Sequence, residues 1–125
     1  MKTAFTIAIF CAGGGLARYY LSGWIHNMLG WSFPFGTLAV NVSGAYFIGL
    51  LMELSLRNAA IPGLLRVGLT VGFMGGLTTF STFSYETFKL LESGRIVLAF
   101  TNVLLSVAAC LFLTWLGIVT ARAIV

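Results

Sequence analysis

The sequence predicts an all-α membrane protein in which four helices cross the bilayer and the third helix is broken. Of the 125 residues, 59% are hydrophobic and only 8% are charged, which is too little charge to cover the surface of a soluble domain. At about 20 residues per crossing plus short loops, this length allows roughly four helices in one domain, residues 1–125. The break is indicated by a glycine- and hydroxyl-rich passage, residues 72–84, inside an otherwise apolar segment. In lipid, non-helical backbone persists only where protein buries it or where it lines a wet cavity, so this passage predicts an ion or substrate site.

The first two segments read as uninterrupted membrane helices. The first runs from about Thr3 to Met28, with Arg18 in its second half. It is longer than the usual 7–15-residue core of a signal peptide, so we expect it to stay in the protein. The second runs from about Thr37 to Leu56, after Pro34, and carries Asn41 near its start.

The third segment is too long for one straight crossing. It runs from Pro62 to about Leu91, which is about 45 Å if continuous, against a hydrocarbon core of about 30 Å. A break at Gly75-Gly76 removes the excess. The fourth segment runs from Ile96 to Ala121, between Arg95 and Arg122.

The charges do not fix one orientation in the membrane. Four crossings place both termini on one side, which carries Lys2, Arg57, Arg66 and Arg122. The other side carries Lys89 and Arg95, with Arg18 leaning toward it. This bias is small for the positive-inside rule, so insertion both ways up and an antiparallel dimer of identical chains are plausible. The net charge of +4 forms no basic block, and we expect no nucleic-acid partner.

Several small residues indicate packing rather than chemistry. Four short helices make a thin bundle that can hardly enclose a polar path alone, which favours a homo-oligomer in lipid. Close helix contact is expected at Gly13, Gly14, Ala17, Gly44 and Gly49. We interpret Cys11 and Cys110, both inside apolar runs, as small buried residues rather than a disulfide.

The chain lacks the residues of an enzyme. Its one histidine, His26, lies between Trp24 and Trp31 and is expected to be a polar anchor at the interface. The three carboxylates are spread over segment ends, at Glu53, Glu86 and Glu92. They form no acid–base pair, and no metal motif is present in the sequence.

What remains is a set of neutral polar and aromatic groups at membrane depth. Asn102, Ser106 and Cys110 recur every fourth residue, so they share one helix face. Phe80 and Phe83 are three residues apart, and the positive edges of their rings suit a small anion in a pore. Each single hydroxyl also has an ordinary explanation, because such groups bridge helices or bond backbone carbonyls.

Arg18 has two interpretations. A charge within the bilayer is costly unless the side chain pairs, snorkels to the interface or lies in a vestibule. In the last case it would concentrate anions near a pore mouth.

The segments Gly36-Thr-Leu-Ala-Val-Asn41 and Gly72-Phe-Met-Gly-Gly-Leu-Thr-Thr-Phe-Ser-Thr-Phe83 closely resemble the signatures of the Fluc/CrcB fluoride channel family. The length and the four-helix layout match as well, so the resemblance covers essentially the whole chain. It implies a dual-topology homodimer in the cell inner membrane, with two antiparallel pores that export fluoride passively.

The resemblance also implies roles for individual residues. The backbone carbonyls of Gly75 and Thr78 from both chains would hold a structural Na⁺ at the dimer centre. The pore residues would be Asn41, Phe80, Thr82, Phe83, Asn102 and Ser106, with Cys110 next along the fourth-segment track and Arg18 in the vestibule. Some family members carry a tyrosine in place of Asn102 and a hydroxyl in place of Cys110.

Two other classes remain open. A small proton-coupled multidrug exporter is also short, four-helical and often dual-topology, but it needs an intramembrane carboxylate. The first segment has none, and Glu53 and Glu86 lie toward segment ends. An accessory membrane subunit, whose polar groups only join helices, would conduct nothing when reconstituted alone.

Overall fold

The computed structural model describes residues 1–57 and 61–124, which are helical apart from short connections. The elements are α1 (Lys2–Leu29), α2 (Phe35–Arg57), α3 (Gly63–Val67), the π-helix η1 (Gly68–Met74), α4 (Gly75–Leu77), α5 (Phe80–Glu92) and α6 (Ile96–Ile124). Four stretches are long and apolar enough to cross a membrane: Lys2–Leu29, Phe35–Arg57, Gly63–Glu92 and Ile96–Ile124. The prediction of an all-helical chain with four membrane-spanning segments is confirmed.

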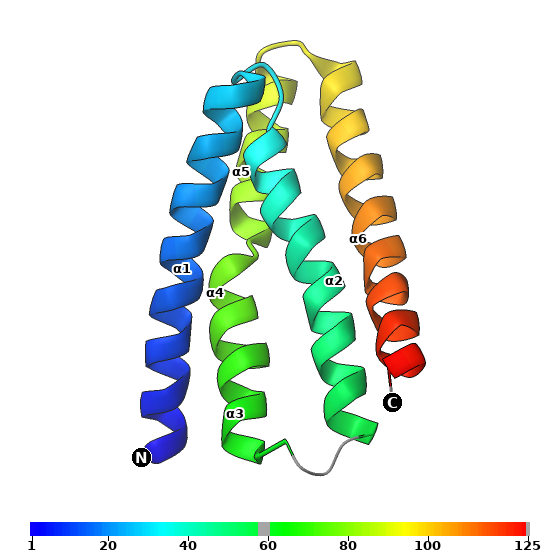
Figure 1. Cartoon of the computed structure of the whole chain (residues 1–125). Helices are drawn as coiled ribbons and strands as arrows, with labels where there is room; N and C mark the ends of the chain where they lie inside the picture. Colours follow the sequence, from blue (N-terminus) through cyan, green and yellow to red (C-terminus); the bar gives the residue numbers. More distant parts are fainter. Residues whose placement is uncertain (58–60, 125) are drawn as a thin grey trace.

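The chain runs up and down the bundle so that both termini lie at the same end, as the sequence predicted (Figure 1). The connections α1–α2 and α5–α6 lie at the opposite end. Each of these two connections contains a glycine with positive φ. Gly30, directly after α1, has φ 89°, and Gly94, between α5 and α6, has φ 73°. Residues with a Cβ rarely adopt that conformation, which explains glycine at both places.

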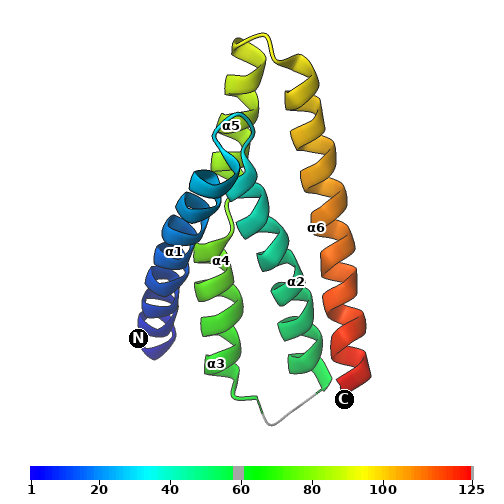
Figure 2. The ribbon, with the colours of Figure 1, turned by 45° about the horizontal axis from the view of Figure 1, so that its top comes forward.

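Two close seams hold the bundle together. Figure 2 shows α1 alongside the α3–α4 stack and α2 alongside α6. A Cβ on Gly14 would collide with the backbone of Phe73 and Leu77, and one on Gly49 would collide with the backbone of Thr114. The close packing predicted for Gly14, Gly44 and Gly49 is confirmed.

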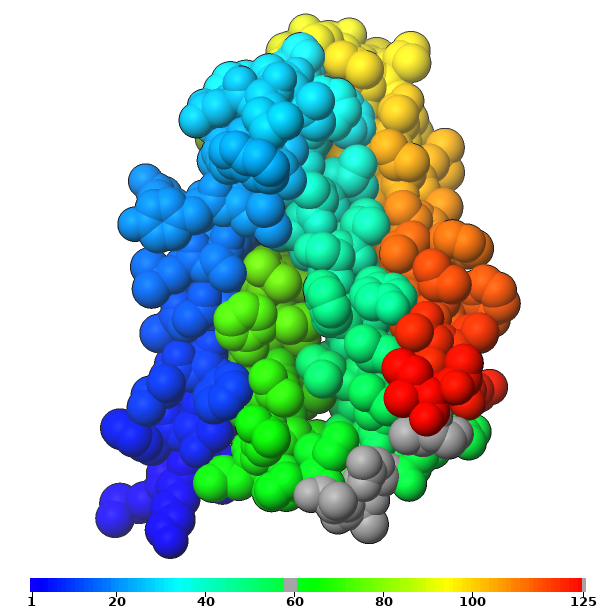
Figure 3. Space-filling model, viewed as in Figure 1, coloured from blue at the N-terminus to red at the C-terminus, as the bar shows by residue number. Residues whose placement is uncertain are grey.

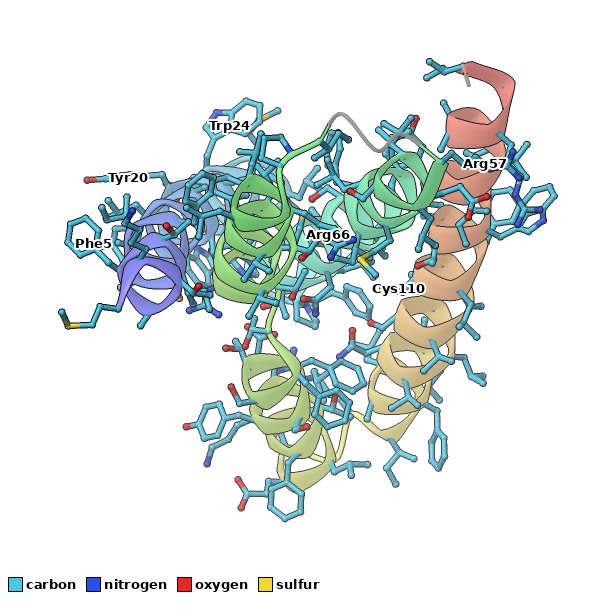
Figure 4. The ribbon with its side chains drawn as sticks, turned by 90° about the horizontal axis from the view of Figure 1, so that it is seen from below. Phe5, Tyr20, Trp24, Arg57, Arg66 and Cys110 are labelled. Atoms are coloured by element: carbon cyan, nitrogen blue, oxygen red, sulfur yellow. The ribbon has the colours of Figure 1, made fainter. Side chains whose placement is uncertain are left out.

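Large apolar side chains point outward, as expected where the surrounding medium is lipid. Figure 4 shows Phe5, Tyr20 and Trp24 projecting away from the bundle on α1. The buried core is correspondingly small and centres on Val40 and its neighbours in the third crossing. Cys11, predicted to be buried, is exposed. The prediction was wrong because an apolar side chain loses nothing by facing lipid.

Ion pairs lie near both ends of the bundle. At the end that carries the termini, Glu53 Oε1 accepts hydrogen bonds from Nε of Arg57 and Nε of Arg122, both at 2.8 Å. This carboxylate therefore joins α2 to α6. At the other end, Nζ of Lys89 lies 2.7 Å from Oε2 of Glu92.

Candidate functional site

The backbone of the third crossing leaves helical geometry at two residues. Thr78 has φ −87° and ψ 155°, and Thr79 has φ −151° and ψ 115°, so both are extended between α4 and α5. The sequence placed the break at Gly75-Gly76, and that position was wrong: both glycines are helical. Gly76 instead allows α1 to pack closely, because a Cβ there would lie 2.5 Å from the carbonyl oxygen of Cys11 on α1.

Asn41 on α2 forms two hydrogen bonds with the extended residue Thr79, through the oxygen and the nitrogen of its side-chain amide. Its Oδ1 accepts a hydrogen bond from the Thr79 backbone N–H at 2.7 Å. Its Nδ2 donates to the Thr79 carbonyl oxygen at 3.0 Å. The side-chain amide thus pairs with Thr79 as a neighbouring peptide would, and one N–H of Nδ2 remains for another acceptor.

The start of α5 is capped by Thr79. Its Oγ1 accepts a hydrogen bond from the Thr82 backbone N–H at 3.2 Å. The Thr79 hydroxyl also donates to Oγ1 of the predicted site residue Thr82 at 3.0 Å, which ties the two side chains together. Threonine is a favoured residue at this position of a helix.

Arg18 reaches the same place from α1. Its Nη1 donates to the Thr78 carbonyl oxygen at 3.3 Å. The half-buried side chain lines a cavity of ≈ 280 Å³ that Thr79 and Thr82 also line. The Arg18 side chain is therefore paired with a backbone carbonyl inside the bundle, which lowers the cost of its charge.

A larger groove lies on the other side of the extended residues. It has a volume of ≈ 490 Å³ and is bounded by α2, η1, α5 and α6. On the face turned to the viewer in the space-filling view of Figure 3, only narrow gaps separate the α3–α4 stack from α2. Cys110, labelled in Figure 4, belongs to the α6 wall of this groove. The predicted site residues that line it are Asn41, Gly75, Thr78, Phe80, Phe83 and Ser106.

The two phenylalanines adjoin each other at the groove. Their ring centroids are 5.4 Å apart and the ring planes are tilted by 49°. Phe80 is 78% exposed, while Phe83 is half-buried. The pair that the sequence placed on one helix face therefore lies together, with Phe80 projecting from the protomer.

The polar residues of α6 form a hydrogen-bonded chain. Ser106 Oγ donates to Asn102 Oδ1 at 3.4 Å, and Asn102 Nδ2 donates to Thr87 Oγ1 at 2.8 Å. Thr87 Oγ1 in turn donates to the Phe83 carbonyl oxygen at 2.7 Å. Asn102 and Ser106 are buried, and they face inward as their four-residue spacing predicted. Thr87 was missed by the sequence analysis.

Glu86 and His26 also lie beside the site, although the sequence analysis did not count them among its residues. Both line a cavity of ≈ 630 Å³ with Thr37 and Thr82, and Glu86 Oε2 is buried without a hydrogen-bond partner. Glu86 follows Thr82 by four residues, so helical spacing alone could have placed it on this face. His26 is 6% exposed and stacks on Trp31 with ring centroids 4.2 Å apart.

The predicted site residues thus occupy two faces of one short region. Arg18 and Thr82 lie on the α1 side, and Phe80, Phe83 and Ser106 lie on the groove side. Thr79 lines both cavities. Asn102 does not line the groove itself and is linked to the groove residues by its bonds with Ser106 and Thr87.

Comparison with known proteins gives matches along almost the entire chain. The family described as CrcB-like protein, Camphor Resistance (CrcB), matches residues 5–118. A protein from Trichlorobacter lovleyi named fluoride-specific ion channel FluC is 72% identical over 124 residues, 99% of each chain. A protein of the same name from Pelobacter propionicus is 70% identical over 125 residues, 100% of this chain and 97% of the relative. Another from Geotalea uraniireducens is 60% identical over 99% of this chain and 100% of its own. The chain therefore belongs to the CrcB family.

Proposed function

We propose that this chain is a fluoride-selective channel that conducts the ion passively across the cytoplasmic membrane, as a multi-pass membrane protein. The observation that carries the proposal is the full-length identity with proteins named fluoride-specific ion channels. Hydrogen-bond donors and aromatic edges near the middle of the third crossing supply a matching chemistry. The activity is conduction rather than catalysis.

The lining groups replace the water that a small anion must shed. The unengaged N–H of Asn41 is a neutral donor at the groove, and the Ser106 hydroxyl becomes a second one when it turns from its long 3.4 Å bond to Asn102 Oδ1. The ring edges of Phe80 and Phe83 add weak positive potential without a full charge, so that an anion is stabilised and still released. On the α1 side, Arg18 raises the local anion concentration.

The functional unit of this proposal is an antiparallel, dual-topology homodimer. A groove of ≈ 490 Å³ beside an aromatic ring that is 78% exposed leaves polar groups of one protomer uncovered. Lipid cannot hydrogen-bond those groups, and a second copy can cover them. One end of the bundle carries four basic residues, and the other end carries three if Arg18 is counted with it. This small difference is compatible with insertion in both orientations.

The carbonyl oxygens of Gly75 and Thr78 fit a structural Na⁺ at the centre of that dimer. In a continuous helix they would accept from the N–H groups of Thr79 and Thr82, but those groups donate to side chains instead. The Thr78 carbonyl accepts from Arg18, and its second lone pair remains. Carbonyl oxygens are suitable ligands for a hard cation. Bound there, the ion would neutralise the carbonyl dipoles that the interruption leaves unpaired.

Fluoride efflux from liposomes that contain only this chain tests the proposal, with chloride as the control ion. We expect fluoride efflux without chloride efflux and without need of a pH gradient. Phe80→Ile should reduce fluoride efflux sharply because it removes the aromatic edge, and Phe5→Ile on the outer face of α1 is the matched control. Absence of efflux would indicate an accessory subunit. Transport that requires a pH gradient and is lost in Glu86→Gln would indicate a proton-coupled exporter.

A further inference from the structure

The backbone N–H groups around the extended residues do not all use the usual helical acceptor. A backbone N–H deep in a membrane protein must find an acceptor, and the nearest one is the carbonyl four residues earlier. Thr78 uses it: its N–H donates to the Met74 carbonyl at 3.0 Å. The N–H groups of Thr79 and Thr82 do not follow this pattern, because each donates to a side-chain oxygen.

The two side-chain acceptors are Asn41 Oδ1 and Thr79 Oγ1, at 2.7 Å and 3.2 Å from the nitrogens of Thr79 and Thr82. The carbonyls that lose these donors, four residues earlier in each case, are those of Gly75 and Thr78. The proposed cation ligands and the displaced helical acceptors are thus the same two groups.

Both acceptors are held in place by a second interaction. Asn41 is fixed by its bond from Nδ2 to the Thr79 carbonyl at 3.0 Å. The Thr79 side chain lies within hydrogen-bond distance of Ser81 Oγ, at 3.3 Å, and of Thr82 Oγ1, at 3.0 Å. Thr79 is only 8% exposed, so little water is available to replace a lost acceptor.

We propose that Asn41 and Thr79 are positioning residues for the cation site. By accepting the two backbone N–H groups, their side chains stop α4 and α5 from joining into one helix and keep the Gly75 and Thr78 carbonyls available. This inference rests on the proposed structural Na⁺. It gives Asn41 a role through the backbone that is separate from donating a hydrogen bond to the conducted anion.

Sodium dependence of thermal unfolding tests the inference without relying on conduction. The purified chain is titrated with Na⁺ against N-methylglucamine at constant ionic strength, and the sodium concentration at half-maximal stabilisation is recorded. Asn41→Leu and Thr79→Val remove an acceptor with little change in volume. We expect each to raise this midpoint at least about tenfold, which corresponds to about 1.4 kcal/mol of binding free energy.

Conservative variants separate positioning from general damage. Thr79→Ser keeps the hydroxyl in place, so its sodium midpoint should stay within about threefold of wild type. Thr101→Val is the matched control for Thr79→Val, because Thr101 bonds only the Val97 carbonyl on the exposed face of α6. It should titrate as wild type does.

The outcomes distinguish the inference from the proposal on which it rests. A wild-type chain that is indifferent to Na⁺ overturns the cation site and this inference together, while fluoride efflux in the same preparation leaves the channel assignment standing. A normal wild-type response with unchanged midpoints in Asn41→Leu and Thr79→Val overturns the inference alone. Should those two variants fail to fold, Thr79→Ser decides, because loss of its sodium response contradicts the inference.

Discussion

Adding one methyl group to α1 at Gly14 should separate that helix from the third crossing. In Gly14→Ala the new Cβ would lie 2.9 Å from the Leu77 nitrogen and closer still to the Phe73 carbonyl oxygen. Ordinary contact begins at 3.4 Å, and a backbone neighbour cannot rotate away. The two helices must therefore move apart by at least roughly 0.5 Å, an overpacking that costs about 1–3 kcal/mol.

The same displacement reaches the candidate site. Arg18 lies four residues after Gly14 on α1, and its bond to the Thr78 carbonyl is already long at 3.3 Å. A further shift of roughly 0.5 Å exceeds the range of a hydrogen bond. We therefore expect Gly14→Ala to lower both the unfolding temperature and the fluoride flux.

Gly15→Ala is the matched control because it makes the same chemical change one residue along. No atom lies within 4 Å of a Cβ at Gly15. Replacing glycine within a helix should stabilise the chain by about 0.5–1 kcal/mol. Thermal unfolding of both purified variants measures the difference, while the fluoride efflux of Gly14→Ala is compared with wild type because Gly15 lines the Arg18 cavity. If Gly14→Ala unfolds at the same temperature as Gly15→Ala, the seam does not limit the approach of these helices and the reasoning is refuted.

Two further changes probe the polar groups on either side of α5. Asn102→Val should reduce fluoride flux at least about tenfold and destabilise the chain by about 1–3 kcal/mol, since it leaves the half-buried Thr87 hydroxyl and the buried Ser106 hydroxyl without their shared partner. Thr101→Val on the outer face of α6 is its control, and equal fluxes in the two variants would contradict the role of the α6 chain. Arg18→Gln should lower flux most at low ionic strength, because a single cation attracts anions only over about a Debye length. A loss of flux that does not vary with salt would argue that Arg18 acts through its bond to Thr78 alone.

The sequence was sufficient for the crossings but not for the place where the third one changes direction. Apolar runs and the residues Pro34 and Pro62 set the ends of the segments to within a few residues of the observed helices. Gly75-Gly76 looked like the break because glycine is a poor helix former. These residues are nevertheless helical, and the extended pair follows at Thr78 and Thr79.

The position of the extended pair depends on a contact between distant residues. Asn41 lies 38 residues before Thr79 and supplies the acceptor that the local sequence lacks. No local pattern identifies such a partner. Spacing did reveal that Asn102 and Ser106 share a face, because that relation is internal to one helix. The stacking of His26 on Trp31 cannot be inferred from α1 alone either, because Trp31 follows the turn after that helix.

The π-helix η1 aligns three glycines along one line. Gly68, Gly72 and Gly76 each face α1 closely, at intervals of four residues. In an ordinary α-helix four residues exceed a full turn by about 40°, so the third glycine would have rotated by about 80° away from the first. The wider turns of η1 absorb that excess. Ordinary α-helical turns in place of η1, with the same residues, would therefore rotate Gly76 by about 80° relative to Gly68, and α1 could no longer approach both glycines.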